Sequence, residues 1–318
     1  MYYIYQLKFT ALVHLGRAEQ GGSLERVSLG CSADTLFSAL CNELRTEPAK
    51  LNKFISDAKN KKILLSDLMP YNVAGGDTFF FIPKPLIQPP SVAKKKSLVA
   101  KKLKEVEYIR ASRIDEYIAA LKYNKDFIVT KNEYNFGKFD LMTKVNVRQE
   151  IPYTVGSFAF NPHAGLYGIV YLADNNIDEF MELIEYLGLS GIGGKRSSGY
   201  GRFELYDDAY SLEDSFSADD TAISKRILIK NAAYYLALSN VLPNENTLIA
   251  LKHSFYKLQK RSGFIGGSSQ MQKKNSVYMV KAGSCLNARI AGELISLGEC
   301  DNHEILRYGR GMYLGVET

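Results

Sequence analysis

Hydrophobic and polar residues alternate along the first fifteen positions of the chain. One face of this stretch would carry Tyr3, Tyr5, Leu7, Phe9, Ala11, Val13 and Leu15, and the other would carry Gln6, Lys8, Thr10 and His14. A period of two with aromatic and branched residues predicts a β-strand with one buried face and one face in water. A glycine-bearing loop follows, and then the run SADTLFSALCNEL keeps its apolar residues at helical spacing, with Ser32 or Asp34 able to cap the helix start.

Strand and helix patterns continue through both halves of the chain. Strands are expected as short runs within 61–85 and over 145–160, 165–174, 203–206, 226–239, 276–288, 292–298 and 309–316, and helices over 177–187 and 245–261. Strands that begin and close each half favour an α+β fold with antiparallel sheets and helices on one face. A ferredoxin-like βαββαβ unit used twice is the simplest plan of this kind.

The net charge of +6 conceals an uneven distribution along the 318 residues. Residues 1–110 carry 17 basic and 10 acidic side chains, residues 224–318 carry 13 and 6, and residues 203–223 hold seven acids and no base. The acidic, serine-bearing stretch indicates a linker. We therefore predict a first domain over 1–205, an acidic linker over 206–222 and a second domain over 223–318, with two basic lobes that permit a polyanionic partner.

The composition excludes several classes of protein. With 46% hydrophobic and 23% charged residues, the chain is neither disordered nor fibrous. No apolar run reaches the roughly 18 residues of a spanning helix, and the N-terminus lacks the pattern of a signal peptide, so neither a membrane nor export is expected. The four cysteines include no CxxC pair. This argues against a zinc cluster, predicts no metal or other cofactor, and fits a cytoplasmic protein with reduced thiols.

Residues 91–135 differ in composition from their surroundings. Six lysines fall within 94–104, and a charged, helical pattern continues to Leu121. We interpret this region as a basic insertion in the first domain. Its lysines could form either a solvated helix face or an RNA contact.

The most informative segment is LGLSGIGGKRSSGYGRFEL, which begins at Leu187. A Walker A loop fails here because Leu189 stands at its first glycine position and Arg196 at its Ser/Thr position. A dinucleotide fingerprint that starts at Gly191 fails because Arg196 stands where it needs glycine. Both motifs also precede a helix, whereas this loop follows one.

The composition of the loop over 188–202 favours a polyanion contact over a plain flexible turn. Its glycines allow backbone amides to approach a phosphate chain closely. Lys195, Arg196 and Arg202 supply charge, two serines supply hydroxyl donors, and Tyr200 offers a ring on which a base could stack.

The segment GIGGKRSSGYGRFEL resembles the glycine-rich loop of the RAMP superfamily of CRISPR–Cas proteins. The further segments HLG from His14, SADTLFSALCNEL, FFFIPKPL and HEILRYGRGMYLGV occur in the order found in the family of fourth Csm subunits of type III-A CRISPR effector complexes. The resemblance extends over nearly the whole chain. One departure is that Ala33 separates Ser32 from Asp34, where the family usually has Ser-Asp.

The resemblance implies two ferredoxin-like (RRM-like) domains and a scaffold role in antiviral defence without catalysis. Its partners would be the 5′ handle of the CRISPR RNA (crRNA), a large subunit with polymerase-like and HD domains, and the RAMP subunit of the backbone. Carried onto this chain, the residues that line the handle would be Gly191, Gly193, Gly194, Lys195, Arg196, Ser197, Ser198, Gly199 and Tyr200, with Arg148 as a further basic position. The insertion 91–135 would project over RNA as a thumb-like element.

Several residues allow alternative interpretations. His14 could act as general acid or base in a metal-independent endoribonuclease that processes repeat RNA, although no titratable partner is evident in the sequence, so we favour a structural or RNA-contacting role. Asp34 could be catalytic, but an aspartate at a helix start is more often a cap. Lys273 and Lys274, near a second glycine pair, form another candidate RNA contact.

Overall fold

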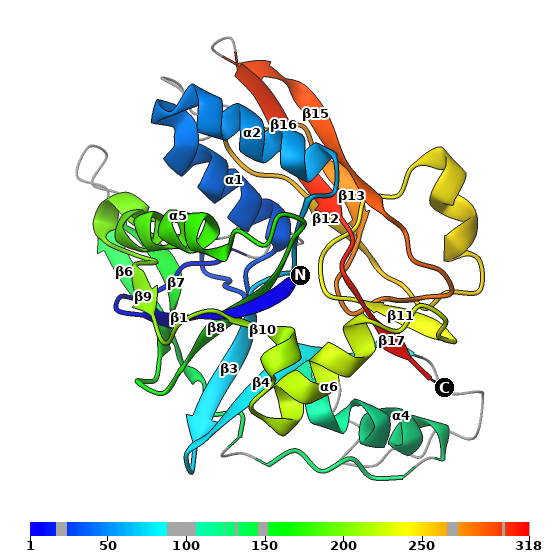
Figure 1. Ribbon diagram of the computed structural model, residues 1–318. Coiled ribbons are helices and arrows are strands. Elements are labelled where there is room, and N and C mark those ends of the chain that lie inside the picture. The colour runs from blue at the N-terminus through cyan, green and yellow to red at the C-terminus, as the bar shows by residue number, and fades with distance from the viewer. Residues whose placement is uncertain are drawn as a thin grey trace.

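The computed structural model describes residues 1–16, 24–87, 106–123, 125–130, 133–145, 152–265, 273–300 and 303–317 (Figure 1). It is a mixed α/β structure in which the paired strands are antiparallel. The prediction of antiparallel sheets combined with helices is therefore confirmed.

The largest sheet is built from the first two thirds of the chain. Its path runs β10-β1-β8-β3-β4-β5, with β2 also paired to β8 and β9 to β1. The strands are β1 (Tyr2–Phe9), β2 (Ile63–Leu65), β3 (Met69–Ala74), β4 (Asp77–Pro83), β5 (Tyr108–Arg110), β8 (Ala164–Leu172), β9 (Phe203–Leu205) and β10 (Tyr210–Ser211). β1 lies inside this sheet, between β8 on one side and β9 and β10 on the other.

Helices cover both faces of this sheet, so the expectation of helices on one face is wrong (Figure 1). On one face, α1 (Ala33–Glu43), α2 (Pro48–Lys59) and α5 (Ile177–Ser190) pack their apolar sides against residues such as Tyr5 and Leu7. On the other face, α4 (Ile114–Lys122) and α6 (Ala218–Ile227) share a core with Ile4 and Ile169. The prediction that one face of the first strand meets water is wrong: Ile4 and Gln6 are buried as well as Tyr5 and Leu7, because the second helical layer covers their side.

The C-terminal part forms smaller antiparallel sheets. They contain β11 (Tyr234–Ala237), β14 (Cys285–Leu286) and β17 (Tyr313–Val316), the hairpin β12 (Leu258–Arg261)–β13 (Val277–Val280), and the hairpin β15 (Gly292–Cys300)–β16 (His303–Arg310). The helix expected over 245–261 is only the 3₁₀ turn η6 (Glu245–Leu251), which is followed by His253 at a left-handed φ of 62° and then by β12. The strand expected over 226–239 shrinks to β11, since its first residues end α6.

The interpretation of 91–135 as an insertion is wrong for its described later part. β5 pairs with β4, and Ile109, Ile114, Ile118 and Phe127 are buried in the core between the sheet, α4 and α6. This part of the chain therefore adds the edge strand β5 to the main sheet and the helix α4 to the layer that packs on it. The lysine run over 94–104 lies outside the described residues.

Residues 206–222, expected to be an acidic linker, are packed into the structure. They include β10, the 3₁₀ turn η5 (Leu212–Asp214) and the start of α6. Asp219 is fully buried and accepts hydrogen bonds from the Ser112 amide (2.8 Å), the Phe80 amide (3.3 Å) and Arg110 Nε (3.1 Å). A buried carboxylate with such partners fastens α6 to the edge of the sheet.

Asp34 does not cap α1, contrary to the prediction. The N-cap is Ser32, without a side-chain cap bond, and the Ala33 amide donates to Asp67 Oδ1 (2.8 Å). Asp34 is instead buried between two guanidinium groups, with Arg261 Nε at 3.1 Å and Arg307 Nη1 at 2.5 Å from its Oδ2 atom. It thereby ties the first helix to β12 and β16.

The charge of Asp34 depends on these two arginines. Burial by itself would raise the pKa of this carboxyl group, but the Arg261 and Arg307 guanidiniums outweigh it and lower the pKa below its ordinary value. Asp34 is thus a buried anion held between two cations.

No helix in the described ranges is long and apolar enough to cross a membrane.

Candidate nucleic-acid interface

The glycine-rich loop begins where α5 ends. Gly191 has a φ of 81°, and its amide donates to the Leu187 carbonyl at 2.7 Å, which closes the last turn of the helix. A left-handed residue at this position suits glycine. The loop then runs to β9 through the short 3₁₀ turn η4 (Arg196–Ser198).

The base of the loop is fixed to the segment that follows β1. The Gly194 amide donates to the His14 carbonyl (2.9 Å), the Gly201 amide to the Leu12 carbonyl (2.8 Å), and the Ile192 amide to the Gly201 carbonyl (3.0 Å). The Ile192 side chain is fully buried. The base of the loop is therefore held in one conformation by backbone hydrogen bonds and by the buried Ile192 side chain; we call these contacts the frame of the loop.

Gly201 and Gly199 provide a matched test of this frame. Both have a left-handed φ, 78° and 81°, but a Cβ at Gly201 would lie 2.0 Å from the Ile192 carbonyl oxygen, whereas a Cβ at Gly199 meets nothing within 4 Å. We expect Gly199→Ala to cost roughly 1–2 kcal/mol of unfolding free energy from backbone strain alone. Gly201→Ala should lower the free energy of unfolding, measured by urea denaturation, distinctly more than Gly199→Ala does. Equal losses would contradict the close packing of the frame around Gly201.

At the outer part of the loop, the groups accessible for binding are side chains more than backbone amides. Ser197, Ser198 and Arg202 are exposed, and Lys195 and Arg196 are half-buried. The Ser198 and Gly199 amides are already bonded to the carbonyls of Lys195 and Arg196 at 2.9 and 2.8 Å. The expectation that loop amides in general approach phosphates is therefore too broad, because many of them hold the loop together.

Two residues expected to meet RNA are buried. His14 is only 6% exposed, its Nδ1 atom lies 2.7 Å from the Gly156 carbonyl oxygen, and its ring lies directly beneath Gly194. Tyr200 is also 6% exposed, and its hydroxyl lies 3.8 Å from Met142 Sδ. In this structure His14 supports the loop from below, and the ring of Tyr200 is covered and not open to a base.

A hairpin missed in part by the sequence analysis lies beside the loop. β6 (Gly137–Val145) pairs with β7 (Pro152–Phe160) along its whole length. Lys195 Nζ lies 3.3 Å from the Tyr153 hydroxyl, and Lys144 lies 4.4 Å above the Tyr200 ring. The period-two pattern of Phe139, Leu141, Thr143 and Val145 was the available signal for β6.

One loop cation is also linked to α1. Arg196 lies 3.7 Å from Glu43, the last residue of that helix, and Glu43 also accepts a hydrogen bond from Ser190 at 2.8 Å. The structure thus gathers Lys144, Lys195 and Arg196 around one loop, with Arg202 exposed at its end.

The other predicted contacts lie elsewhere. Lys273 is exposed, whereas Lys274 is half-buried and donates to the Ser38 hydroxyl on α1 (3.3 Å), and burial lowers its pKa. Arg148 lies outside the described residues. Within the described part of the chain, no group of three or more His, Cys, Asp or Glu side chains could hold a metal ion.

Comparison with known proteins shows a match to one family model and similarity to several curated proteins. Residues 230–316 match the family model of the CRISPR Csm4 C-terminal domain. A protein described as "CRISPR system Cms protein Csm4" from Mycobacterium tuberculosis (strain CDC 1551 / Oshkosh) is 28% identical over 301 residues, which cover 92% of each chain. The protein of the same description from Streptococcus thermophilus is 27% identical over 310 residues, covering 93% of this chain and 94% of that one.

Solved structures show a similar fold. The fold matches a chain of the Csm3–Csm4 subcomplex of the type III-A CRISPR–Cas interference complex with a TM-score of 0.63 and 17% identity, over 99% of both chains. It matches a chain of the Csm1–Csm4 cassette in complex with pppApA with a TM-score of 0.62 and 17% identity, over 100% of this chain and 98% of that one.

The chain therefore has the same overall fold as these chains of solved type III-A CRISPR–Cas complexes. Its residues 230–316 match the Csm4 C-terminal domain, and over most of its length the chain is similar to proteins described as Csm4.

Proposed function

We propose that this chain is a non-catalytic RNA-binding scaffold subunit of a type III-A Csm complex. It holds the 5′ handle of crRNA with the cations Lys195, Arg196 and Arg202 of the 191–202 loop, and it docks a large subunit and a backbone subunit in cytoplasmic antiviral defence. The observation that carries the proposal is the loop itself, in which Lys195, Arg196 and Arg202 project from a turn whose base is fixed by hydrogen bonds to Leu12 and His14. Cations on a fixed frame can bind a phosphate chain without being reordered first.

The proposed architecture is two ferredoxin-like domains. In the first part of the chain, β1, α1, the β2–β3 segment, β8, α5 and β9 follow in order, and β1 and β8 are the central strands between β9 and β2–β3. This arrangement has the connectivity of a βαββαβ unit. The partners are proposed because the solved neighbours are chains of a Csm3–Csm4 subcomplex and of a Csm1–Csm4 cassette.

The alternative, an endoribonuclease that uses His14, is less well supported. The His14 ring is buried and its Nδ1 atom is engaged by the Gly156 carbonyl, so the group that would transfer protons lies beneath the loop and not on its surface.

The proposal predicts that this subunit protects the crRNA handle. The experiment assembles the subunits of one Csm complex on crRNA with and without this chain, digests with a single-strand nuclease, and measures the 5′ fragment that survives. We expect the 5′ handle to be protected only when the chain is present, because the glycine-rich loop covers the sugar-phosphate backbone of the handle. Equal digestion of the handle in both samples would overturn the proposal.

A companion assay addresses catalysis. Purified chain is incubated with repeat RNA in EDTA, and we expect no specific cleavage. Cleavage that disappears in His14→Ala would support the endoribonuclease instead.

A further inference from the structure

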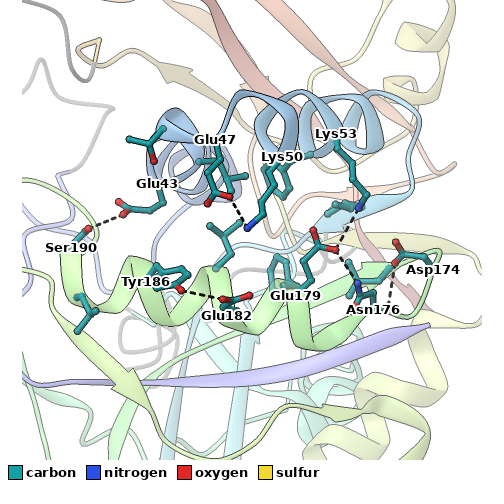
Figure 2. Close-up of a pocket in the computed structure, with 18 residues that line it drawn as sticks. Glu43, Glu47, Lys50, Lys53, Asp174, Asn176, Glu179, Glu182, Tyr186 and Ser190 are labelled. Carbon is teal, nitrogen blue, oxygen red and sulfur yellow. Dashed lines mark hydrogen bonds and ion pairs between the residues drawn. The ribbon is translucent and has the colours of Figure 1, made fainter.

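A groove lies between α5 and the segment formed by the end of α1, the 3₁₀ turn η2 (Leu44–Thr46) and α2. It encloses about 390 Å³, and side chains from the two walls face one another across it (Figure 2). Glu43 and Ser190 stand at one end of the groove, beside the glycine-rich loop. The RNA site proposed above does not use this space.

The floor of the groove is apolar. It is formed by the buried side chains of Leu44, Phe54, Leu172, Phe180 and Leu183. Two further large side chains on α5, Tyr186 and Leu189, line the groove yet are 54% and 74% exposed. Apolar surface left open beside a formed groove is typical of a binding site.

The walls of the groove are acidic although the chain as a whole carries +6. The lining includes the carboxylates Glu43, Glu47, Asp174, Glu179 and Glu182 against only Lys50 and Lys53. Both lysines are already paired, Lys50 with Glu47 (2.7 Å) and Lys53 with Glu179 (3.6 Å). Glu43 lies 3.7 Å from Arg196 of the glycine-rich loop, which leaves Asp174 and Glu182 as the carboxylates of the lining outside these ion pairs. Glu182 accepts a hydrogen bond from the neutral Tyr186 hydroxyl (3.1 Å), so its charge faces the groove without a cation bonded to it in the described part of the chain.

We infer that this groove docks a basic amphipathic segment of a neighbouring protein subunit, with apolar side chains on the floor and Lys or Arg side chains against Glu182 and the other carboxylates. The inference rests on the proposed function, since it needs a complex in which such a neighbour exists. The excess of carboxylates repels nucleic acid and complements a cationic peptide. The groove shape, with helices on both sides, fits an extended or helical segment.

Charge reversal inside and outside the groove tests the inference. Glu182→Lys changes a lining residue, and Glu185→Lys makes the same change on the same helix at an exposed position outside the lining. Binding of each purified variant to the large subunit and to the backbone subunit is measured separately by titration. We expect Glu182→Lys to weaken binding to one of them at least about tenfold, because a repelling charge replaces an attracting one, and Glu185→Lys to leave it within about twofold.

The same samples separate this inference from the proposed function. Handle protection that persists while Glu182→Lys binds both neighbours normally would overturn the groove inference alone. Loss of handle protection in the unmodified complex would overturn the proposed function instead.

A photoreactive phenylalanine at position 186 identifies the occupant in the reconstituted complex. The expected crosslink is to a segment of one neighbouring subunit that combines Lys or Arg with apolar residues. A crosslink to RNA, to a second copy of this chain, or to no subunit would contradict the inference.

Discussion

Replacing Asp34 with alanine is expected to lower the free energy of unfolding by about 3–5 kcal/mol. The substitution leaves the guanidinium groups of Arg261 and Arg307 buried without the carboxylate that lies 3.1 and 2.5 Å from them. An uncompensated buried charge is costly because protein interior solvates it poorly. Urea unfolding followed by circular dichroism measures the loss.

The control for Asp34→Ala is Asp178→Ala, which removes an exposed carboxylate from the first turn of α5. We expect its effect to stay within about 1 kcal/mol, the range for an acid near a helix start. Asp34→Asn, which keeps the shape but not the charge, should also be clearly destabilising. Equal midpoints for Asp34→Ala and the wild type would show that the buried ion group contributes nothing to stability.

The effect of Asp34→Ala should also depend on pH. The pKa of Asp34 is lower in the folded chain than its ordinary value, so the folded state prefers the ionised form. This contribution is present in full above the ordinary carboxyl pKa of about 4 and is lost as the pH falls through the folded-state pKa. The stability gap between wild type and Asp34→Ala should therefore narrow only in acid.

The double substitution Lys195→Ala/Arg196→Ala is expected to weaken retention of crRNA by at least about 100-fold. Each removed cation can donate a hydrogen bond to a phosphate, and bonds to charged groups contribute about 1.5–3 kcal/mol. The salt dependence should fall as well, since each lost contact to single-stranded RNA reduces the slope of log K against log salt by about 0.7. Filter binding of the assembled complex at several salt concentrations measures both quantities.

Lys122→Ala/Lys125→Ala serves as the charge-matched control. These lysines are exposed at and just after the end of α4, on the other side of the main sheet from α5 and its loop (Figure 1). We expect this variant to retain crRNA nearly as well as the wild type. If both double variants lose RNA equally, general charge and not the loop holds the handle.

Local sequence patterns predicted the helices and strands that have one apolar side packed against the core. The helix from Ala33 and the helix from Ile177 carry apolar residues at helical spacing, and both were found. The strand β6 was not predicted although its period-two pattern is present, and its apolar residues Phe139 and Leu141 are exposed instead of belonging to a core. The pattern at 245–261 was misinterpreted as a helix because spacing alone does not show that His253 adopts a left-handed φ.

The roles of charged and polar residues could be predicted less well. Asp34 has the position of a helix cap, yet its partners Arg261 and Arg307 are 227 and 273 positions away in the sequence. Asp219 stands in a stretch with the composition of a linker, yet it is buried by contacts with β4 and β5. A short window of sequence contains no information on ion pairs and hydrogen bonds between residues that lie so far apart in the chain.

The sequence alone determined the α+β class, the family resemblance and the position of the glycine-rich loop, because periodicity, glycine content and motif order are local properties of the chain. Only the tertiary structure decided that His14 and Tyr200 lie beneath or within the loop while Lys195, Arg196 and Arg202 remain accessible. It also brought α2 and α5 together to form an acidic groove. The physical reason is that burial and electrostatic pairing depend on distances between segments far apart in the chain, which are set only when the helices pack on the sheet.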